Sequence, residues 1–239
     1  MHVIRTIKVL LLCGLLMSPI LGQALSHHAT LAQSYLSQGK LRLAEKELLK
    51  AKNRGEPFEE WGVQLGQTYL LQKKYQKALQ AATLSDKPPK KLSSTVKIAL
   101  SLIEARAFIG LKQYNEAEQL LKKSLTLAPK NFEILYFNAE VQLHKHKLGA
   151  ASHYIQQAIQ LPNLSKTDLA KLHILQACKY KHEGQVHTAL NSYKQALVAD
   201  ANCHVARVGI ANLMLAEREK DIYSEESESI YMSAIHNVE

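Results

Sequence analysis

Apolar and polar positions alternate at helical spacing between Ile98 and Pro129, with one short interruption. Apolar residues recur at steps of three and four on both sides of a break at Lys112, as expected for two amphipathic helices. The first group is Leu102, Ala105, Phe108 and Ile109, and the second is Tyr114, Ala117, Leu120, Leu121 and Leu125. This pattern predicts a helical hairpin with a tight turn near Lys112.

The same spacing returns along almost the whole chain. Five complete copies begin at Leu25, Glu59, Ile98, Phe132 and Ala170, and a partial copy begins at His204. Successive copies are separated by 34, 39, 34, 38 and 34 residues. The longer steps contain Asp86 to Lys91 and Leu161 to Ser165, which are expected to be exposed loops because proline does not fit a helix interior. Ser165 or Thr167 is expected to cap the helix that follows.

Small and aromatic residues in each copy indicate a known repeat. Ala105 and Ala117 are small where the helices would cross, Phe108 and Tyr114 are aromatic near the turn, and Pro129 follows the second helix. This order resembles the tetratricopeptide (TPR) repeat. The resemblance implies an all-α, right-handed TPR solenoid of about five and a half helix-turn-helix repeats with a C-terminal capping helix.

Two subgroups of TPR proteins share more of the pattern. The stretch YLSQGKLRLAEKELLKA, followed by TYLLQKKYQKAL, is similar to the front of envelope TPR proteins of PEP-CTERM/exosortase and exopolysaccharide systems. The pilotin family of type IV pili, with six repeats, is the second resemblance. Both imply a non-catalytic scaffold that takes part in assembling an envelope or export complex.

The two ends of the chain differ from the repeats. Arg5 and Lys8 precede an apolar run that ends in Gly22-Gln23-Ala24, a pattern typical of a secretory signal peptide. We therefore expect residues 1–24 to be a signal peptide, 25–216 the TPR array and 217–239 an acidic capping helix and tail. The mature protein would be periplasmic or secreted. The alternative is an uncleaved segment that anchors the protein in the inner membrane.

Charge is unevenly distributed. The whole chain has a formal net charge of +9, but residues 217–239 carry seven acidic residues against Arg218 and Lys220, a net of −5. The basic excess of the repeats predicts either a solvated outer face or contact with an anionic polysaccharide or membrane surface. The export signal and the lack of a recognised nucleic-acid-binding motif disfavour nucleic acid.

Residues that could carry chemistry do not form a catalytic pattern. The sequence has no glycine-rich phosphate loop, G-x-S-x-G or H-E-x-x-H motif, so we predict neither an enzyme nor a cofactor. His173, Cys178, His182 and His187 are the densest potential metal ligands, but their spacing does not give four compact ligands. A disulfide between Cys178 and Cys203 is disfavoured, because their axial offset would be roughly 13 Å at 1.5 Å per residue.

The TPR resemblance also implies where a partner would bind. In TPR proteins one side of each first helix lines a concave groove, and chaperone-binding members place basic residues and asparagine there to hold a carboxylate. Ala29 and Gln33 stand in the first of those places, so that clamp is missing. Leu71 and Leu102 either line the groove or pack against adjacent helices. We expect an apolar or amphipathic protein segment to bind Gln33, Val63, Gln67, Leu70, Arg106, Ile109, Tyr136, Glu140, Leu143 and Ile174.

Overall fold

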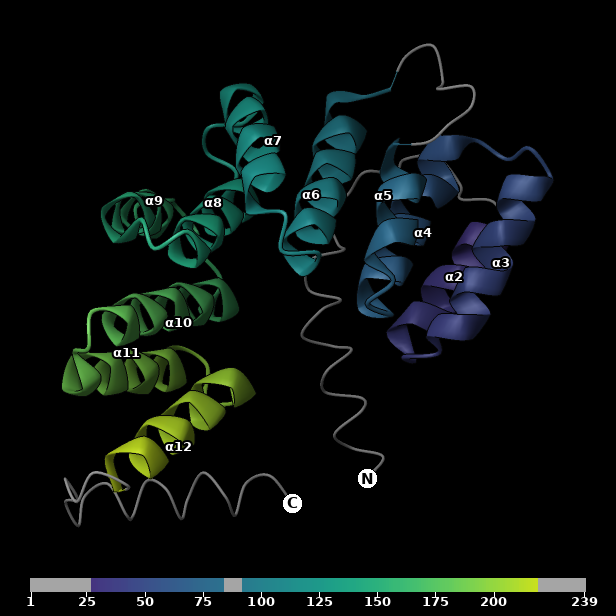
Figure 1. Cartoon of the computed structure of the whole chain (residues 1–239). Helices are drawn as coiled ribbons and strands as arrows, with labels where there is room; N and C mark the ends of the chain where they lie inside the picture. Colours follow the sequence, from purple (N-terminus) through teal and green to yellow (C-terminus); the bar gives the residue numbers. More distant parts are fainter. Residues whose placement is uncertain (1–26, 84–91, 219–239) are drawn as a thin grey trace. The chain divides into compact units, whose positions relative to one another are not determined.

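The computed structural model describes residues 27–83 and 92–218, which form helices and no strand (Figure 1). The expected all-α fold is confirmed. The predicted signal peptide, the insert of residues 86–91 and the predicted C-terminal capping helix lie outside the described residues. The helices are α2 (His27–Ser37), α3 (Leu41–Asn53), α4 (Phe58–Leu71), α5 (Tyr75–Thr83), α6 (Ser94–Gly110), α7 (Tyr114–Leu127), α8 (Phe132–His144), α9 (Leu148–Ile159), α10 (Lys166–His182), α11 (Val186–Ala199) and α12 (His204–Arg218).

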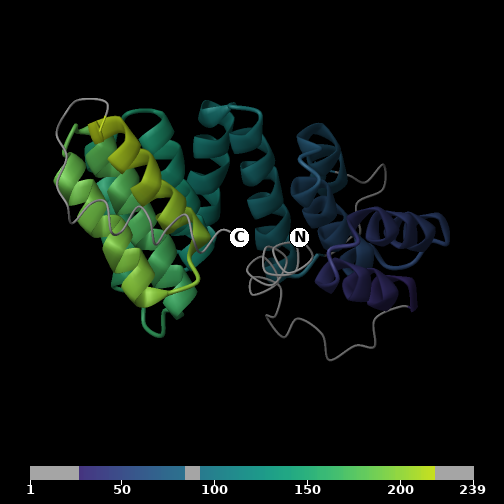
Figure 2. The ribbon, with the colours of Figure 1, turned by 90° about the horizontal axis from the view of Figure 1, so that it is seen from below.

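The chain divides into two compact units, Met1–Ala128 and Pro129–Glu239. In the N-terminal unit each of α2 to α6 packs against the next helix, and the alternate helices α2, α4 and α6 are also neighbours. In the C-terminal unit α8 to α12 pack in the same consecutive manner, and α8 also contacts α10. Figure 2 shows the green and yellow helices of the C-terminal unit side by side. Each unit is therefore a stack of helical hairpins.

The turn of each hairpin places one residue in the left-handed backbone region. These residues are Gly39, Lys73, Lys112, His146 and Gly184, with φ between 54° and 70°. At the third hairpin the Gln113 N–H donates to the Phe108 carbonyl at 2.8 Å and the Lys112 N–H donates to the Ile109 carbonyl at 3.0 Å. This is the Schellman motif, which satisfies the last carbonyls of a helix. The turn residues are 34, 39, 34 and 38 apart, which confirms the repeat spacing and the turn at Lys112.

Alanines allow the helices to approach closely. Ala105 and Ala117 are completely buried, as expected for residues at a helix crossing. The residues equivalent to Ala117 in the other four hairpins are also completely buried; they are Ala44, Ala78, Ala151 and Ala189. A larger side chain at such a position would push the helices apart, because interiors of this kind are close-packed.

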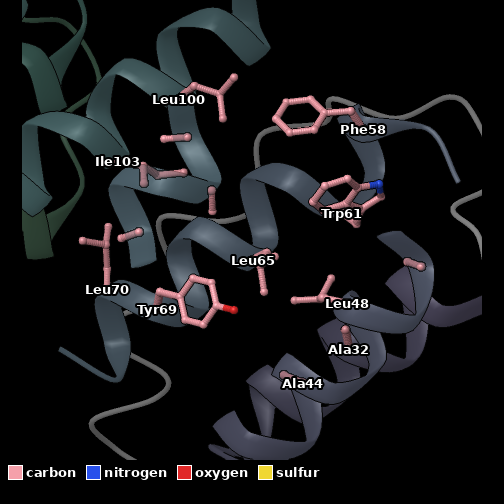
Figure 3. Packing of buried hydrophobic residues seen from close by; sticks show 14 of the residues in the cluster. Ala32, Ala44, Leu48, Phe58, Trp61, Leu65, Tyr69, Leu70, Leu100 and Ile103 are labelled. Atoms are coloured by element: carbon pink, nitrogen blue, oxygen red, sulfur yellow. The ribbon is translucent and has the colours of Figure 1, made fainter. Parts of the chain in front are cut away.

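Larger side chains fill the core of the N-terminal unit (Figure 3). Trp61 and Phe58 on α4 meet edge to face, with ring centroids 5.1 Å apart. The Trp61 indole N–H donates to the Glu56 carbonyl at 3.0 Å, which satisfies its polar group in the core. Leu48 from α3 and Ile103 from α6 belong to the same buried cluster. The cluster therefore joins three successive hairpins.

In three hairpins a polar side chain caps the N-terminus of the first helix. The Ser165 hydroxyl accepts a hydrogen bond from the Asp168 N–H at 3.0 Å at the start of α10, which confirms the predicted cap. Ser93 caps α6 and Asn131 caps α8 in the same way. Because α9 ends at Ile159 and α10 begins at Lys166, the second predicted insert lies outside the helices.

Candidate partner-binding surfaces

The predicted groove residues fall on two sets of alternate helices, one in each unit. The N-terminal set lies on α2, α4 and α6 and consists of Gln33, Val63, Gln67, Leu70, Arg106 and Ile109. The C-terminal set lies on α8 and α10 and consists of Tyr136, Glu140, Leu143 and Ile174. Because helices within each set are neighbours, the structure defines two surfaces, which we call the α2–α4–α6 surface and the α8–α10 surface.

Two of the predicted groove leucines are core residues. Leu70 is 8% exposed and Leu143 is 5% exposed, so the expectation of exposed apolar side chains at these positions is wrong. Leu143 packs with Ile155 and Leu175 of neighbouring helices. Leu102 is buried as well, whereas Leu71 is half-buried against the core. On the first helix of a hairpin, a residue on the groove side also faces the next hairpin. Large apolar side chains at such positions therefore pack in the core.

The other predicted residues of the α2–α4–α6 surface are half-buried, and three of the five are polar. Gln33, Val63, Gln67, Arg106 and Ile109 all retain some exposure. The Oε1 atom of Gln67 is buried and has no hydrogen-bond partner among residues 27–83 and 92–218. An unsatisfied amide oxygen of this kind is costly and can accept a hydrogen bond from a bound segment. This surface thus combines apolar side chains with an acceptor.

An aromatic cluster forms the centre of the α8–α10 surface. The Tyr136 ring lies 6.0 Å from the Phe132 ring and 5.2 Å from the Phe137 ring, measured between centroids. From α10, the Lys171 ammonium lies 5.6 Å from the Phe132 centroid and 2.9 Å from the Asp168 carboxylate. All three rings are half-buried. The surface therefore offers partly exposed aromatic area beside a cation, which suits an amphipathic segment.

Sequence reasoning missed Phe132, Phe137 and Lys171 as members of this cluster. It also missed an apolar face on α12, where Val205 is 59% exposed, Val208 40% and Leu215 42%. The spacing of three and seven residues within the partial sixth copy is the signal that could have found the α12 face. No comparable signal predicts that Lys171 lies over Phe132, because the pairing depends on how two hairpins stack.

The histidine and cysteine candidates do not converge. His173 contacts Gln176 at 2.9 Å, the Cys178 sulfur lies 3.9 Å from the Tyr193 hydroxyl oxygen, and the His182 ring meets the His146 ring with centroids 4.8 Å apart. Within the described ranges no group of three His, Cys, Asp or Glu side chains is arranged to hold a metal ion.

Both thiols of the described chain, Cys178 and Cys203, are free. Burial raises the pKa of the Cys203 thiol, which keeps it protonated and unreactive at neutral pH. Burial likewise raises the pKa of the Glu104 carboxyl, and burial together with His182 and His146 lowers the pKa of His144. In each case burial is the largest cause of the pKa shift.

No helix among residues 27–83 and 92–218 has the length and apolar character needed to span a membrane.

Several basic residues of the described chain form ion pairs. Lys50 lies 2.8 Å from the Glu47 carboxylate, and Lys122 lies 2.8 Å from the Glu118 carboxylate. Lys46 and Lys123 are exposed and so carry part of the basic excess into solvent.

Comparisons with known proteins agree with this architecture. The family model described as "Tetratricopeptide repeat" matches residues 102–131, which include most of the hairpin formed by α6 and α7. A BBSome complex member from Xenopus tropicalis, BBS4, is 28% identical over 113 residues, which is 47% of this chain. The matched part is 21% of BBS4, so the chain spans about a fifth of that relative.

Solved structures share the fold at low sequence identity. TTC0263, a TPR protein of Thermus thermophilus, matches with a TM-score of 0.65 and 18% identity over 80% of this chain and all of that one. The Cut9–Hcn1 hetero-tetramer of the APC/C matches with a TM-score of 0.68 and 14% identity over 98% of this chain and 47% of that one. A Parabacteroides merdae TPR protein matches with a TM-score of 0.59 and 17% identity over 88% and 77%.

The family model shows one tetratricopeptide repeat at residues 102–131, and the other hairpins have equivalent turns at the same spacing. The fold of the chain is that of a TPR solenoid. Proteins built from these repeats are generally non-catalytic and bind other proteins.

Proposed function

We propose that this chain is a scaffold that binds an amphipathic segment of a partner protein on the faces of its first helices. The aromatic cluster on the α8–α10 surface carries the proposal. The half-buried Tyr136 ring meets the half-buried rings of Phe132 and Phe137, and partly exposed aromatic side chains are frequent anchors of protein interfaces. Lys171 beside them favours a segment that also carries a carboxylate.

The α2–α4–α6 surface supplies a second contact region in this proposal. Arg106 and Ile109 on α6 and Gln67 on α4 offer a cation, an apolar side chain and an unsatisfied acceptor. Such a mixture suits an extended or helical segment with few charges. Two similar proteins, a BBSome complex member and the Cut9–Hcn1 hetero-tetramer of the APC/C, belong to multi-protein assemblies, which agrees with a scaffold role.

The cell envelope is the compartment that we propose for this function. The first support is residues 1–24, whose basic residues and apolar run are typical of a signal peptide. The second is the resemblance to two subgroups of envelope TPR proteins. Mass spectrometry of protein from its native host should find the mature N-terminus at Leu25. Retention of Met1 to Ala24 would favour an inner-membrane anchor over a periplasmic or secreted protein.

Binding of an anionic polysaccharide or membrane surface is the alternative function. Exposed basic residues such as Lys46 and Lys123 favour it, because the segment before the acidic tail carries most of the positive charge. Charge-driven binding weakens steeply between low and physiological ionic strength. Binding through the aromatic cluster should persist under the same change.

Site-specific crosslinking tests the protein-binding proposal directly. A photoreactive phenylalanine at position 136 should capture a defined partner in the native host, while the same group at position 46 should not. With that partner purified, Tyr136→Ala should weaken binding by about 2 kcal/mol or more, the usual size of an interface hot spot. The matched control reverses the charges of Lys46 and Lys123, which are exposed. If the control loses the partner and Tyr136→Ala keeps it, the basic outer face is the binding surface.

A further inference from the structure

Three histidines meet at the turn end of two successive hairpins in the C-terminal unit. His144 is the last residue of α8, His146 lies in the turn that follows, and His182 is the last residue of α10. The His146 and His182 rings meet edge to face with centroids 4.8 Å apart, and His144 interacts electrostatically with both. All three side chains are exposed. We call this set the histidine cluster.

The local fold does not require these imidazoles. His146 has a φ of 54°, and the equivalent turn positions in the first and fifth hairpins are Gly39 and Gly184, where no side chain is needed. Lys179 and Lys181 already place cations in the last turn of α10, where positive charge favours the helix dipole. The histidine cluster is therefore available for binding.

The surroundings of the histidine cluster are basic. The charged residues nearest to it along the chain are Glu140 on α8, Lys145 and Lys147 in the turn, and Lys179, Lys181 and Glu183 at the end of α10. Glu183 lies 3.1 Å from the Lys179 ammonium. The helices α9 and α11, which pack against α8 and α10, contain no acidic residue, and their first titratable side chains are His153 and His187. Between residues 141 and 199 the chain has seven lysines and only two acidic residues, so protonated imidazoles would find little negative charge nearby.

We infer that the histidine cluster binds a multiply charged oxyanion, such as a phosphate group, and binds it more tightly as the pH falls. Imidazole side chains gain their positive charge between about pH 8 and pH 5. Neighbouring imidazolium groups repel one another, and an anion in contact with them removes that repulsion. An imidazolium donates hydrogen bonds from both ring nitrogens, and such charge-assisted bonds to phosphate oxygens are strong. The exposed ammonium groups of Lys147 and Lys181 add positive charge beside the site.

The electrostatics of His144 agree with an anion as the ligand. Burial, His182 and His146 lower the pKa of His144, so this imidazole resists protonation when no counter-ion is present. A bound oxyanion opposes that effect and raises the pKa. Because coupling between two bound ligands is reciprocal, protonation must strengthen anion binding by the same factor.

A metal ion fits this cluster less well. Among residues 27–83 and 92–218 no group of three His, Cys, Asp or Glu side chains is arranged to hold one. Metal ions also bind neutral imidazole, so their affinity falls in acid. The direction of the pH dependence therefore separates an anion site from a metal site.

The histidine cluster is separate from the proposed partner site. Phe132 begins α8 and His144 ends it, so the aromatic cluster and the histidine cluster are separated by roughly 18 Å of helix at 1.5 Å per residue. The inference goes beyond the proposed function and does not depend on it.

Sulfate binding to the purified full chain tests this assignment. Sulfate has the same charge at both pH values used, so any change in its affinity comes from the protein. Calorimetry should show at least about tenfold tighter binding at about pH 5.5 than at about pH 7.5, with protons taken up on binding at the lower pH. The double variant His146→Gln with His182→Gln should weaken sulfate binding at about pH 5.5 by about tenfold and remove most of the pH dependence.

The matched control is His153→Gln on α9. His153 is exposed and contacts Gln157 at 3.1 Å, outside the histidine cluster, so this change should leave sulfate binding unchanged. Far-ultraviolet circular dichroism reports whether each variant remains folded. Equal sulfate affinity at both pH values, or undiminished binding by the double variant, overturns the inference. Zinc binding that requires the same two histidines and weakens in acid, without sulfate binding, assigns the cluster to a metal ion and also overturns it.

Anionic vesicles distinguish two sources of the phosphate group. Vesicles that contain phosphatidylglycerol should sediment with the wild-type chain at about pH 5.5 if a lipid headgroup is the ligand, and the double variant should lose this binding. Sulfate and inorganic phosphate binding without such vesicle binding supports a soluble phosphate compound at the same site. Because Tyr136 has no part in these experiments, failure of the inference leaves the proposed partner site unaffected.

Discussion

The two units build their cores from the same hairpins but fill them differently. The buried cluster of the N-terminal unit contains three aromatic rings beside seven alanines, and the rings Phe58, Trp61 and Tyr69 all lie on α4. The buried cluster of α10, α11 and α12 in the C-terminal unit contains one aromatic ring beside five alanines. That ring is Tyr193, and it packs directly against Gly209 of α12, where an added β-carbon would lie 2.5 Å from a ring atom.

Both cores also seat rings on glycines, since Phe58 lies against Gly62 and Tyr75 against Gly110 in the N-terminal unit. The N-terminal core differs in having more large rings that interlock with neighbouring side chains. Removing a large side chain should therefore damage the N-terminal core most, while adding an atom at a ring-packed glycine such as Gly209 tests the contact that the two units share.

Trp61→Ala should have the largest effect. Truncating a buried tryptophan typically costs about 3–5 kcal/mol, and Trp61 is 6% exposed. Denaturant unfolding should show this loss, and hydrogen exchange should place the lost protection mainly in α3 to α6, because stacked repeats transmit damage mostly to their neighbours. An equal loss of protection in α10 to α12 would mean that the two units do not have separate cores.

Gly209→Ala should have a smaller effect, about 1–3 kcal/mol, because the added methyl group must displace the buried Tyr193 ring. The additional change Tyr193→Leu removes the ring and should cancel part of the cost, a coupling that a double-mutant cycle measures. Gly149→Ala in α9 is the matched control. Nothing lies within 4 Å of its β-carbon, so helix propensity should raise stability by about 0.5–1 kcal/mol. Additive costs for Gly209 and Tyr193 would contradict the ring-on-glycine account.

The sequence was sufficient to predict the fold because local signals agree along the chain. Completely buried alanines such as Ala117, turn residues such as Lys112 and the cap Ser165 each fall where periodicity placed them. The candidate site was harder to predict. Leu70 and Leu143 share a helix face with groove residues, yet both are buried by neighbouring helices. Whether a leucine at such a position is exposed depends on how hairpins stack, and helical periodicity within one hairpin does not contain that information.

A buried ion pair makes the first hairpin sensitive to pH. The Glu47 carboxylate lies 2.8 Å from both the Lys50 ammonium and the His28 Nδ1 atom, and these two partners lower its pKa. A carboxyl group with a lowered folded-state pKa contributes stability above its unfolded pKa and loses it as the pH falls through the folded value. Glu47→Gln should therefore lower the melting temperature at about pH 7 and have little further effect near pH 3. An equal decrease at both pH values would show that packing, and not charge, is responsible.

The smallest predicted effect concerns the turns, where each unit uses both glycine and non-glycine residues in the left-handed region. Lys112 adopts a φ of 61° and Gly184 a φ of 70° at equivalent positions. A non-glycine residue in this region is strained by about 1–2 kcal/mol, while glycine adds about 0.5–1 kcal/mol of unfolded-state entropy. Lys112→Gly should therefore stabilise the N-terminal unit by about 0.5–1 kcal/mol, and Gly184→Ala should destabilise the C-terminal unit by a similar amount. Because no atom lies within 4 Å of a β-carbon built at Gly184, that loss can come only from the backbone. If denaturant unfolding shows changes of the same sign in both variants, backbone strain does not decide the residue at these turns.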